Sequence, residues 1–289
     1  MTLSRSIIAA TNFSGKANNA ISYAAGFAKA TGAKLILFNS FSISIHSANS
    51  RISAEAIQKE LDAASLRLET IGRELSHLFA IEVDCFCSYS FLEEQLLALI
   101  HDTNAELVIM GMADCSLQQD LMGNATTSII KNVNIPVLAV PINARFVNLK
   151  KILFALDREG LSPIQSLGWF AQKVEALKTE VEIFDLNQRL PELIKEQYLL
   201  GVENKKSDMA IKLVYKNIQS NTVIREIKQE IENYNADLLV ITPQKYGFWD
   251  SVMHIIKTRI MASELEIPLL SLPNFQTGPE KYKVLEKYK

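Results

Sequence analysis

Short apolar runs alternate with longer amphipathic segments along the first half of the chain. The runs have the length of strands, and the segments between them carry apolar positions three and four residues apart, which is the helical period. Strands are predicted near 6–11, 34–40, 81–88, 106–111 and 136–141, and helices near 15–31, 51–78, 91–102 and 124–133. Such alternation is typical of right-handed crossovers that build a parallel sheet covered on both faces. The first half is therefore predicted to be a small doubly wound α/β unit.

The clearest single element is the helix predicted over 51–78. Its apolar positions alternate spacings of four and three residues, which places them in one stripe along the helix. They are Ile57, Leu61, Ala64, Leu68, Ile71, Leu75 and Leu78. The stripe favours a helix packed on its own sheet over a helix that binds a partner.

Three blocks of the first half recur in the same order in the second half. They pair Arg5–Gly15 with Lys150–Gly160, Ala105–Met110 with Ala236–Ile241, and Asn134–Pro141 with Glu266–Pro273. Second-half strands are predicted near 151–156, 181–186, 211–216, 237–242 and 267–272. Because such a repeat indicates a duplicated structural unit, the predicted fold class is α/β with two doubly wound five-stranded parallel-sheet domains in tandem.

We place the first domain at 1–145 and the second, which ends in a polar, lysine-rich tail, at 146–289. The segment that joins them contains no flexible Gly/Ser linker, so the two domains are expected to pack together within the chain.

Composition and charge narrow the class of protein. Of 289 residues, 48% are hydrophobic and 21% charged, and the formal net charge of −2 gives no field that would attract nucleic acid or an anionic membrane. The first apolar run is too short for a signal peptide, and no segment approaches the length of a membrane span. We expect a cytoplasmic protein that binds neither nucleic acid nor membrane.

The three cysteines are Cys85, Cys87 and Cys115, and they have no metal-ligand spacing. We interpret them as reduced packing residues, and no metal site is predicted.

Ligand chemistry is expected in the loops after the first and fourth strands, because ligands of open parallel sheets bind beyond the carboxyl ends of the strands, where strand order reverses. The first loop contains Thr11, Asn12 and Ser14, and Asn12 could hydrogen-bond a base or ribose. The alternative is that these side chains only cap and turn the chain. The second loop runs from Gly111 to Gly123 and leads into the hydroxyls of 126–128, a pattern that could cradle phosphates at a helix start.

These two loops carry a specific resemblance to a known family. Thr11-Asn12-Phe13-Ser14, Gly111, Gly123 and the closing Ile135-Pro-Val-Leu resemble the universal stress proteins, whose pattern has Thr-Asp-Phe-Ser after strand one and Gly-x2-Gly-x9-Gly-(Ser/Thr) after strand four. The second half resembles the same family through Leu156-Asp157 and Ile267-Pro-Leu-Leu, so the likeness covers roughly residues 4–273.

The resemblance implies a fold like that of the adenine nucleotide alpha-hydrolases and a site for ATP or a related adenine nucleotide in the first domain. It implies a stress-response regulatory or binding protein, with a homodimer and unidentified protein clients as further partners. The nucleotide-binding positions that match the family are Ala10, Thr11, Asn12, Ser40, Gly111, Ala113, Gly123, Asn124, Ala125 and Thr126.

Four departures from the family pattern weigh against tight phosphate binding. Asn12 replaces an acid, Asp114 stands where the second glycine belongs, the gap to Gly123 is one residue short, and Asn124 replaces Ser/Thr. A carboxylate about 4 Å from a phosphate would cost roughly 1–4 kcal/mol. Asp114 therefore opposes a triphosphate unless it points away or shares a bound Mg²⁺.

The corresponding loop of the second half, Thr242–Ser251, has one glycine, a proline and bulky aromatic residues. Phe248 and Trp249 are expected to fill a vacant pocket or to dock against the neighbouring domain. Asp157 retains the family's acid without the loop that would use it. Nucleotide binding is therefore predicted for the first half alone.

Two other functions stay open from the sequence. One is a dimeric scaffold that binds protein partners without a nucleotide, and the other is a slow ATP hydrolase. The histidines His46, His77, His101 and His254 form no constellation with a nucleophile, so no catalytic residue is assigned.

Overall fold

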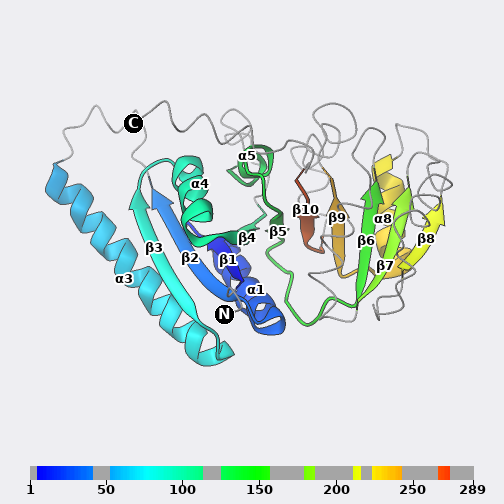
Figure 1. The fold of residues 1–289 in the computed structure, drawn as a ribbon, viewed down its shortest axis with the longest axis horizontal. Helices are drawn as coiled ribbons and strands as arrows, with labels where there is room; N and C mark the ends of the chain where they lie inside the picture. Colours follow the sequence, from blue (N-terminus) through cyan, green and yellow to red (C-terminus); the bar gives the residue numbers. More distant parts are fainter. Residues whose placement is uncertain are drawn as a thin grey trace. The chain divides into compact units, whose positions relative to one another are not determined.

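The structure is a computed structural model that describes residues 5–41, 53–112, 125–156, 179–185, 211–215, 223–242 and 266–273. The chain divides into two compact units, Met1–Leu149 with Ile255–Leu270, and Lys150–His254 with Ser271–Lys289. Strands β1 to β5 belong to the first unit, and β6 to β9 belong to the second (Figure 1). Each unit is described by itself below.

The first unit alternates strands and helices, as predicted. Its elements are β1 (Ser6–Ala10), α1 (Gly15–Thr31), β2 (Lys34–Phe41), α3 (Ala54–Phe79), β3 (Val83–Tyr89), α4 (Leu92–Thr103), β4 (Ala105–Gly111), α5 (Ala125–Asn132) and β5 (Val137–Val140). The strands lie in the order β3-β2-β1-β4-β5, and each neighbouring pair is parallel. The prediction of an α/β fold with a parallel sheet is confirmed.

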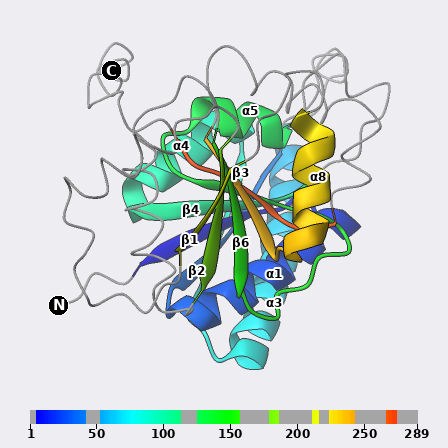
Figure 2. The same cartoon turned by 90° about the vertical axis from the view of Figure 1, so that its right-hand side faces the viewer.

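Helices cover both faces of this sheet. Helix α1 contacts α3, and α4 contacts α5. The two helix pairs lie on opposite sides of the strands, with α4 and α5 above and α1 and α3 below in Figure 2. Because β1 is covered on both faces, all five of its residues are buried. The buried face of α1 is rich in alanine, which lets the helix backbone approach the sheet closely.

Helix α3 packs against β3 and β2, as its apolar stripe predicted, but the stripe is not buried along its whole length. Leu68 is fully buried, whereas Leu78 is 73% exposed. A stripe with a spacing of 3.5 residues drifts by about 20° per heptad on a straight α-helix, and Leu78 lies three heptads beyond Ile57. This drift accounts for the exposed side chain, which the sequence analysis placed in the stripe.

The segment that follows β5 is fastened to α1. The buried Asn19 amide of α1 donates hydrogen bonds to the carbonyl oxygens of Pro141 (2.8 Å) and Ala144 (2.9 Å). The ring of Phe146 meets Tyr23 and Phe27 edge to face, with centroids 5.3 and 5.9 Å apart. Residues 141–146 therefore pack as part of the first unit.

The second unit repeats the same kind of construction. Its described elements are β6 (Lys151–Leu156), β7 (Glu180–Asp185), β8 (Ile211–Tyr215), α8 (Val223–Tyr234) and β9 (Leu238–Ile241). The strands lie in the order β9-β6-β7-β8 and pair in parallel. The division of the chain into two units falls within strand β10 (Leu269–Ser271), after Leu270. Helix α8 was not predicted, and it is strongly amphipathic.

Several predictions for the second half lie outside the described residues. They are those for Asp157, Phe248, Trp249, His254 and the tail beyond residue 273. Among the described helices, none is both long enough and apolar enough to cross a membrane.

Candidate functional site

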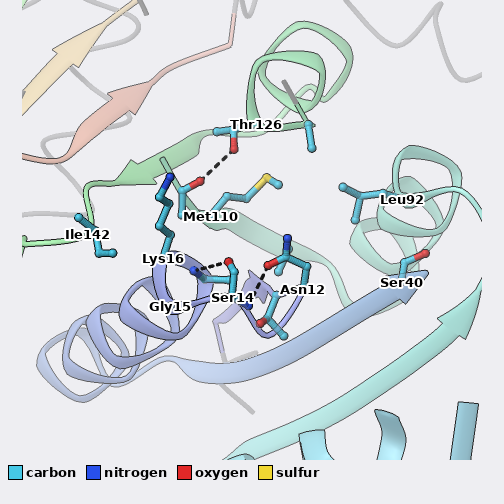
Figure 3. Close-up of a pocket in the computed structure, with 14 residues that line it drawn as sticks. Asn12, Ser14, Gly15, Lys16, Ser40, Leu92, Met110, Thr126 and Ile142 are labelled. Atoms are coloured by element: carbon cyan, nitrogen blue, oxygen red, sulfur yellow. Dashed lines mark hydrogen bonds between the residues drawn. The ribbon is translucent and has the colours of Figure 1, made fainter. Parts of the chain in front are cut away.

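A cavity of about 550 Å³ lies at the carboxyl ends of the first unit's strands. The strand order reverses between β1 and β4, because β2 and β3 follow on one side of β1 while β4 and β5 lie on the other. This is the point at which an open α/β sheet binds its ligand, and the volume is within the usual range for small-molecule sites. The cavity is lined by Ala10, Thr11, Asn12, Ser14, Gly15, Lys16, Ala17, Ser40, Leu92, Met110, Gly111, Ala125, Thr126 and Ile142 (Figure 3).

The loop between β1 and α1 is held by its own side chains. Thr11 Oγ1 accepts a hydrogen bond from the Phe13 N–H at 2.9 Å, and Asn12 Oδ1 accepts one from the Ser14 N–H at 3.1 Å. Ser14 is the N-cap of α1, since its Oγ accepts from the Ala17 N–H at 3.3 Å. The capping interpretation therefore holds for all three polar side chains, and it coexists with their place in the cavity wall.

Phe13 adopts a left-handed backbone conformation inside this loop, with φ of 61°. A bulky residue rarely adopts this conformation unless the surrounding structure holds it there. The guanidinium of Arg67, on α3, lies 4.4 Å from the centroid of the Phe13 ring. The hydrogen bonds within the loop and the Arg67 guanidinium against the Phe13 ring therefore hold the loop, and with it Asn12, in one conformation.

Strand β2 supports the floor of the cavity. The buried Asn39 side chain donates to the Thr11 carbonyl oxygen at 2.7 Å, which ties the end of β2 to the end of β1. Ser40, the next residue, donates from its hydroxyl to the carbonyl oxygen of Ser90 at 2.6 Å. Ser40 is therefore oriented by the start of the α4 segment while it lines the cavity.

Gly111 ends β4 against the first turn of α1. A Cβ at this position would lie 2.9 Å from both the carbonyl carbon and the carbonyl oxygen of Lys16, and backbone atoms cannot give way cheaply. The Gly111 carbonyl oxygen accepts a hydrogen bond from Thr126 Oγ1 at 3.1 Å, which connects β4 to α5. The glycine is therefore required for packing between a strand and a helix.

Two helices begin at the cavity, and they set its electrostatic character. The first residues of α1 (Gly15, Lys16) and of α5 (Ala125, Thr126) are all in the wall. Helix starts present backbone N–H groups and the positive end of the helix dipole. Lys16 is the one charged residue among the fourteen described lining residues, which include no carboxylate and no imidazole. The described wall is suited to hold an anion.

The described residues offer no cluster of three or more His, Cys, Asp or Glu side chains that could hold a metal ion. The sequence analysis left open a Mg²⁺ shared by Asp114 and a bound nucleotide, and Asp114 lies outside the described residues.

The structure brings seven of the ten predicted nucleotide-binding positions together at this cavity. These are Ala10, Thr11, Asn12, Ser40, Gly111, Ala125 and Thr126. The other three, Ala113, Gly123 and Asn124, lie outside the described residues. Whether any of the ten binds a nucleotide stays a prediction.

Sequence reasoning missed several lining residues. Lys16 could have been found, because it comes two residues after the predicted N-cap in the loop that follows the first strand. Leu92, Met110 and Ile142 carry no such signal, since apolar residues at element ends are common. Only the folded chain brings them to the same cavity.

Comparisons with known proteins agree with this architecture. The family model described as the universal stress protein family matches residues 4–141. No curated protein sequence matches the chain.

Two solved structures cover nearly all of the chain. The crystal structure of a universal stress protein from Archaeoglobus fulgidus DSM 4304 is 12% identical and covers 93% of this chain and 96% of its own, with a TM-score of 0.71. A functionally unknown protein from Pseudomonas aeruginosa PAO1 is 16% identical and covers 98% of this chain and 97% of its own, with a TM-score of 0.53. At these identities the likeness shows the fold alone.

Proposed function

Residues 4–141 belong to the universal stress protein family, and on this premise we propose that the first unit binds an adenine nucleotide in the cavity between β1 and β4. The observation that carries the proposal is the cavity itself. It lies at the strand-order reversal and gathers residues from β1, β2, β4 and α5 that the family resemblance had marked separately along the sequence. The protein would act as a stress-response regulatory or binding protein whose state follows the nucleotide.

The chemistry of the wall supports this ligand class. Ala10, Leu92, Met110 and Ile142 give the cavity an apolar part that suits a flat base. The starts of α1 and α5 give it a part that suits phosphate. A ligand with a base at one end and a phosphate at the other would use both parts.

Hydrolysis of the nucleotide has no support from the described wall. General base catalysis needs a carboxylate, imidazole or similar group within hydrogen-bond reach of the attacking water. The fourteen described lining residues supply none. Binding is therefore favoured over the slow-hydrolase alternative.

The direct test is mass spectrometry of small molecules released from freshly purified, denatured protein, together with calorimetric titration of ATP, ADP and AMP with and without Mg²⁺. We expect an adenine nucleotide to be released or to bind with measurable heat. An empty protein that shows neither binding heat nor a ligand-induced thermal shift would overturn the proposal and favour the nucleotide-independent scaffold.

A pair of variants ties the binding to this cavity. Ala125→Phe places a large ring in the wall at the first residue of α5, and we expect it to abolish binding. Ala54→Phe places the same ring at the first residue of α3, at an exposed position outside the cavity wall, and it should bind as the wild type does. Equal binding by the two variants would place the nucleotide elsewhere.

We also propose that the second half is a diverged copy of the same domain, in tandem with the first and divided from it near residue 145. The strand order β9-β6-β7-β8 corresponds to β4-β1-β2-β3. Asn104 and Asn235 are both left-handed residues that precede matching strands, with φ of 49° and 54°. The Lys34 N–H donates to the Arg5 carbonyl oxygen at 2.7 Å, and the Glu180 N–H donates to that of Lys150 at the same distance. A cytoplasmic location and a homodimer stay predictions of the sequence.

A further inference from the structure

The chain that follows β5 makes a tight turn at the cavity. Residues 141–144 form a β-turn, closed by a hydrogen bond from the Ala144 N–H to the Pro141 carbonyl oxygen at 3.1 Å. Ile142, one of the two central residues of the turn, lines the cavity. The family model ends at residue 141, so the turn adds to the wall a residue that the family match does not include. Because the cavity is the proposed nucleotide site, any role of the turn in binding rests on the proposed function.

A single buried side chain holds both ends of the turn. Asn19, on α1, is 8% exposed, and its Nδ2 amide donates to the carbonyl oxygens of Pro141 and Ala144 at 2.8 and 2.9 Å. An asparagine amide has two N–H groups, so both are used. Its Oδ1 accepts a hydrogen bond from Arg145 Nη1 at 3.3 Å. Because a buried amide that lost these partners would be left unpaired at a cost in stability, the turn stays where the bonds can form.

The position of Asn19 on α1 explains why the turn reaches the cavity. Asn19 lies four residues after Gly15 and three residues after Lys16, and residues with these spacings share one face of a helix. Gly15 and Lys16 both line the cavity. A turn fastened to Asn19 is therefore held on the face of α1 that forms the cavity wall. In Figure 3, Ile142 and Lys16 lie on one side of the cavity, and Leu92 lies on the other.

Ile142 has apolar surface that a ligand can cover. Its side chain is 46% exposed at the wall of a cavity of about 550 Å³. Small-molecule sites of this size bury most of the ligand's surface, largely against apolar side chains. Covering the exposed part of Ile142 would remove apolar surface from water, which favours binding. The nucleoside part of a nucleotide has the apolar faces of its base for such a contact, and a phosphate has none.

We propose that Ile142 contacts the nucleoside part of the bound nucleotide, and that Asn19 is the positioning residue that holds Ile142 in place. The nucleotide site then extends past β5 into the segment that leads to the second half of the chain. Nucleotide binding and the conformation of this segment are coupled. Because such coupling is reciprocal, a nucleotide that contacts Ile142 also stabilises the turn.

The test compares two truncations within the same segment of the full-length chain, in calorimetric titrations with AMP, ATP and adenosine. Ile142→Ala removes the apolar contact. Val147→Ala is the matched control, because Val147 is 87% exposed and is not among the described lining residues. We expect Ile142→Ala to raise the dissociation constants of all three probes about fivefold, which corresponds to about 1 kcal/mol. Val147→Ala should bind them as the wild type does.

A double-mutant cycle tests the role of Asn19. Asn19→Asp keeps the size of the side chain but removes both N–H donors, and its carboxylate repels the two carbonyl oxygens of the turn. We expect it to weaken AMP binding several-fold by itself and to have little further effect in the Ile142→Ala background, because Asn19 acts through Ile142. A general distortion of the cavity would instead add to the effect of Ile142→Ala and would contradict the positioning role. Where Asn19→Asp does not fold, Ile142→Ala decides.

Hydrogen exchange measures the coupling directly. Saturating AMP should slow exchange in the peptide that covers 141–149 of the wild type, and should slow it less in Ile142→Ala. Unchanged exchange of this peptide in the AMP-saturated wild type would overturn the inference.

The outcomes of the titrations separate this inference from the proposed function. If the wild type binds AMP and Ile142→Ala binds it equally well, the role of Ile142 is overturned and the nucleotide site stands. If Ile142→Ala weakens AMP and ATP but not adenosine, the contact is not with the nucleoside, and the inference is again overturned. If the wild type binds none of the three probes, the proposed function fails and this inference fails with it. Where adenosine binds too weakly to titrate, AMP binding by Ile142→Ala against Val147→Ala decides.

Discussion

At some positions of the first unit the packing permits only one kind of residue, and Gly111 is such a position. A methyl group there would lie 2.9 Å from the Lys16 backbone, whereas a methyl group at Gly15 would meet nothing within 4 Å. We expect Gly111→Ala to lower the free energy of unfolding by about 1–3 kcal/mol, the usual cost of overpacking. Gly15→Ala should be neutral or stabilising by a few tenths to about 1 kcal/mol. Urea unfolding followed by circular dichroism measures both, and equal stabilities would contradict the packing requirement.

The thiols of β3 make a second prediction at this scale. Burial, with smaller contributions from the carboxylates of Glu69 and Asp84, raises the pKa of Cys85 to about 11, and burial also raises the pKa of Cys87. Both cysteines are free thiols. Since the thiolate is the reactive form, we expect slow alkylation by iodoacetamide at pH 8 and a rate for Cys85 that increases up to about pH 11. Peptide mapping of a Cys115→Ser variant would follow each site, and rapid alkylation of the native protein at pH 8 would contradict it.

The same shift has a consequence for stability. A thiol that stays protonated in the folded chain above its ordinary pKa makes the folded state bind more protons than the unfolded state. The contribution of Cys85 is therefore fully present below about pH 9 and is lost as pH increases toward about 11. The free energy of unfolding should fall over this interval, and less so in Cys85→Ala.

At the residue level, the position of a site residue could be predicted from the sequence, but its contacts could not. Asn12 and Gly111 were predicted from their positions after strands one and four, because topology alone sends those loops to the same edge of the sheet. The direction of the Asn12 amide depends on the Ser14 N–H, which is a contact that only the folded loop creates. The role of Gly111 in packing likewise needs the Lys16 backbone beside it.

At the scale of elements, the attachment of the chain after β5 to helix α1 can be tested through the ring of Phe146. Phe146 makes edge-to-face contacts with both Tyr23 and Phe27, and such pairs contribute about 0.5–1.5 kcal/mol each. We expect Phe146→Ala to destabilise the first unit by about 1–3 kcal/mol. Val147→Ala is the control, because Val147 is 87% exposed. Hydrogen exchange of α1 peptides would locate the loss, and unchanged protection of α1 in Phe146→Ala would refute it.

Elements were the most predictable level of this protein. Every predicted strand and helix begins and ends within three residues of its place in the structure, since hydrophobic periodicity and loop residues both mark the boundaries. The misjudged feature is the exposed end of the α3 stripe. A pattern of fours and threes shows which neighbouring residues share a face, but over three heptads the face turns around the helix, and its far end leaves the sheet.

For the whole molecule, the proposed single site fixes a stoichiometry. If the second half is a diverged copy without a phosphate cradle, titration should give one nucleotide per chain, and Ala125→Phe should reduce that to none. A ligand at 100 times its dissociation constant should stabilise the protein by about 2.7 kcal/mol through mass action. Calorimetry gives the number of sites directly, and a value near two would mean that the second half binds as well.

The sequence analysis inferred a repeat because three blocks recur in order, and the proposal of a tandem copy is supported by the corresponding strand orders of the two units. Helix α8 shows the limit of that reasoning. The sequence analysis aligned the strands around it and did not predict it, although α8 is followed by Asn235, a left-handed residue like the Asn104 that follows α4. An alignment based only on apolar runs misses α8, because most residues of this helix are polar.

The contact of Gly111 with helix α1 also affects how related sequences are interpreted. A glycine at this position is required by the meeting of two backbones, so selection for folding alone would preserve it after a nucleotide site had decayed. Counting this glycine as a mark of ligand binding would therefore assign binding to descendants that have lost it. The residues whose retention reports on the ligand are those that line the cavity and that folding does not need.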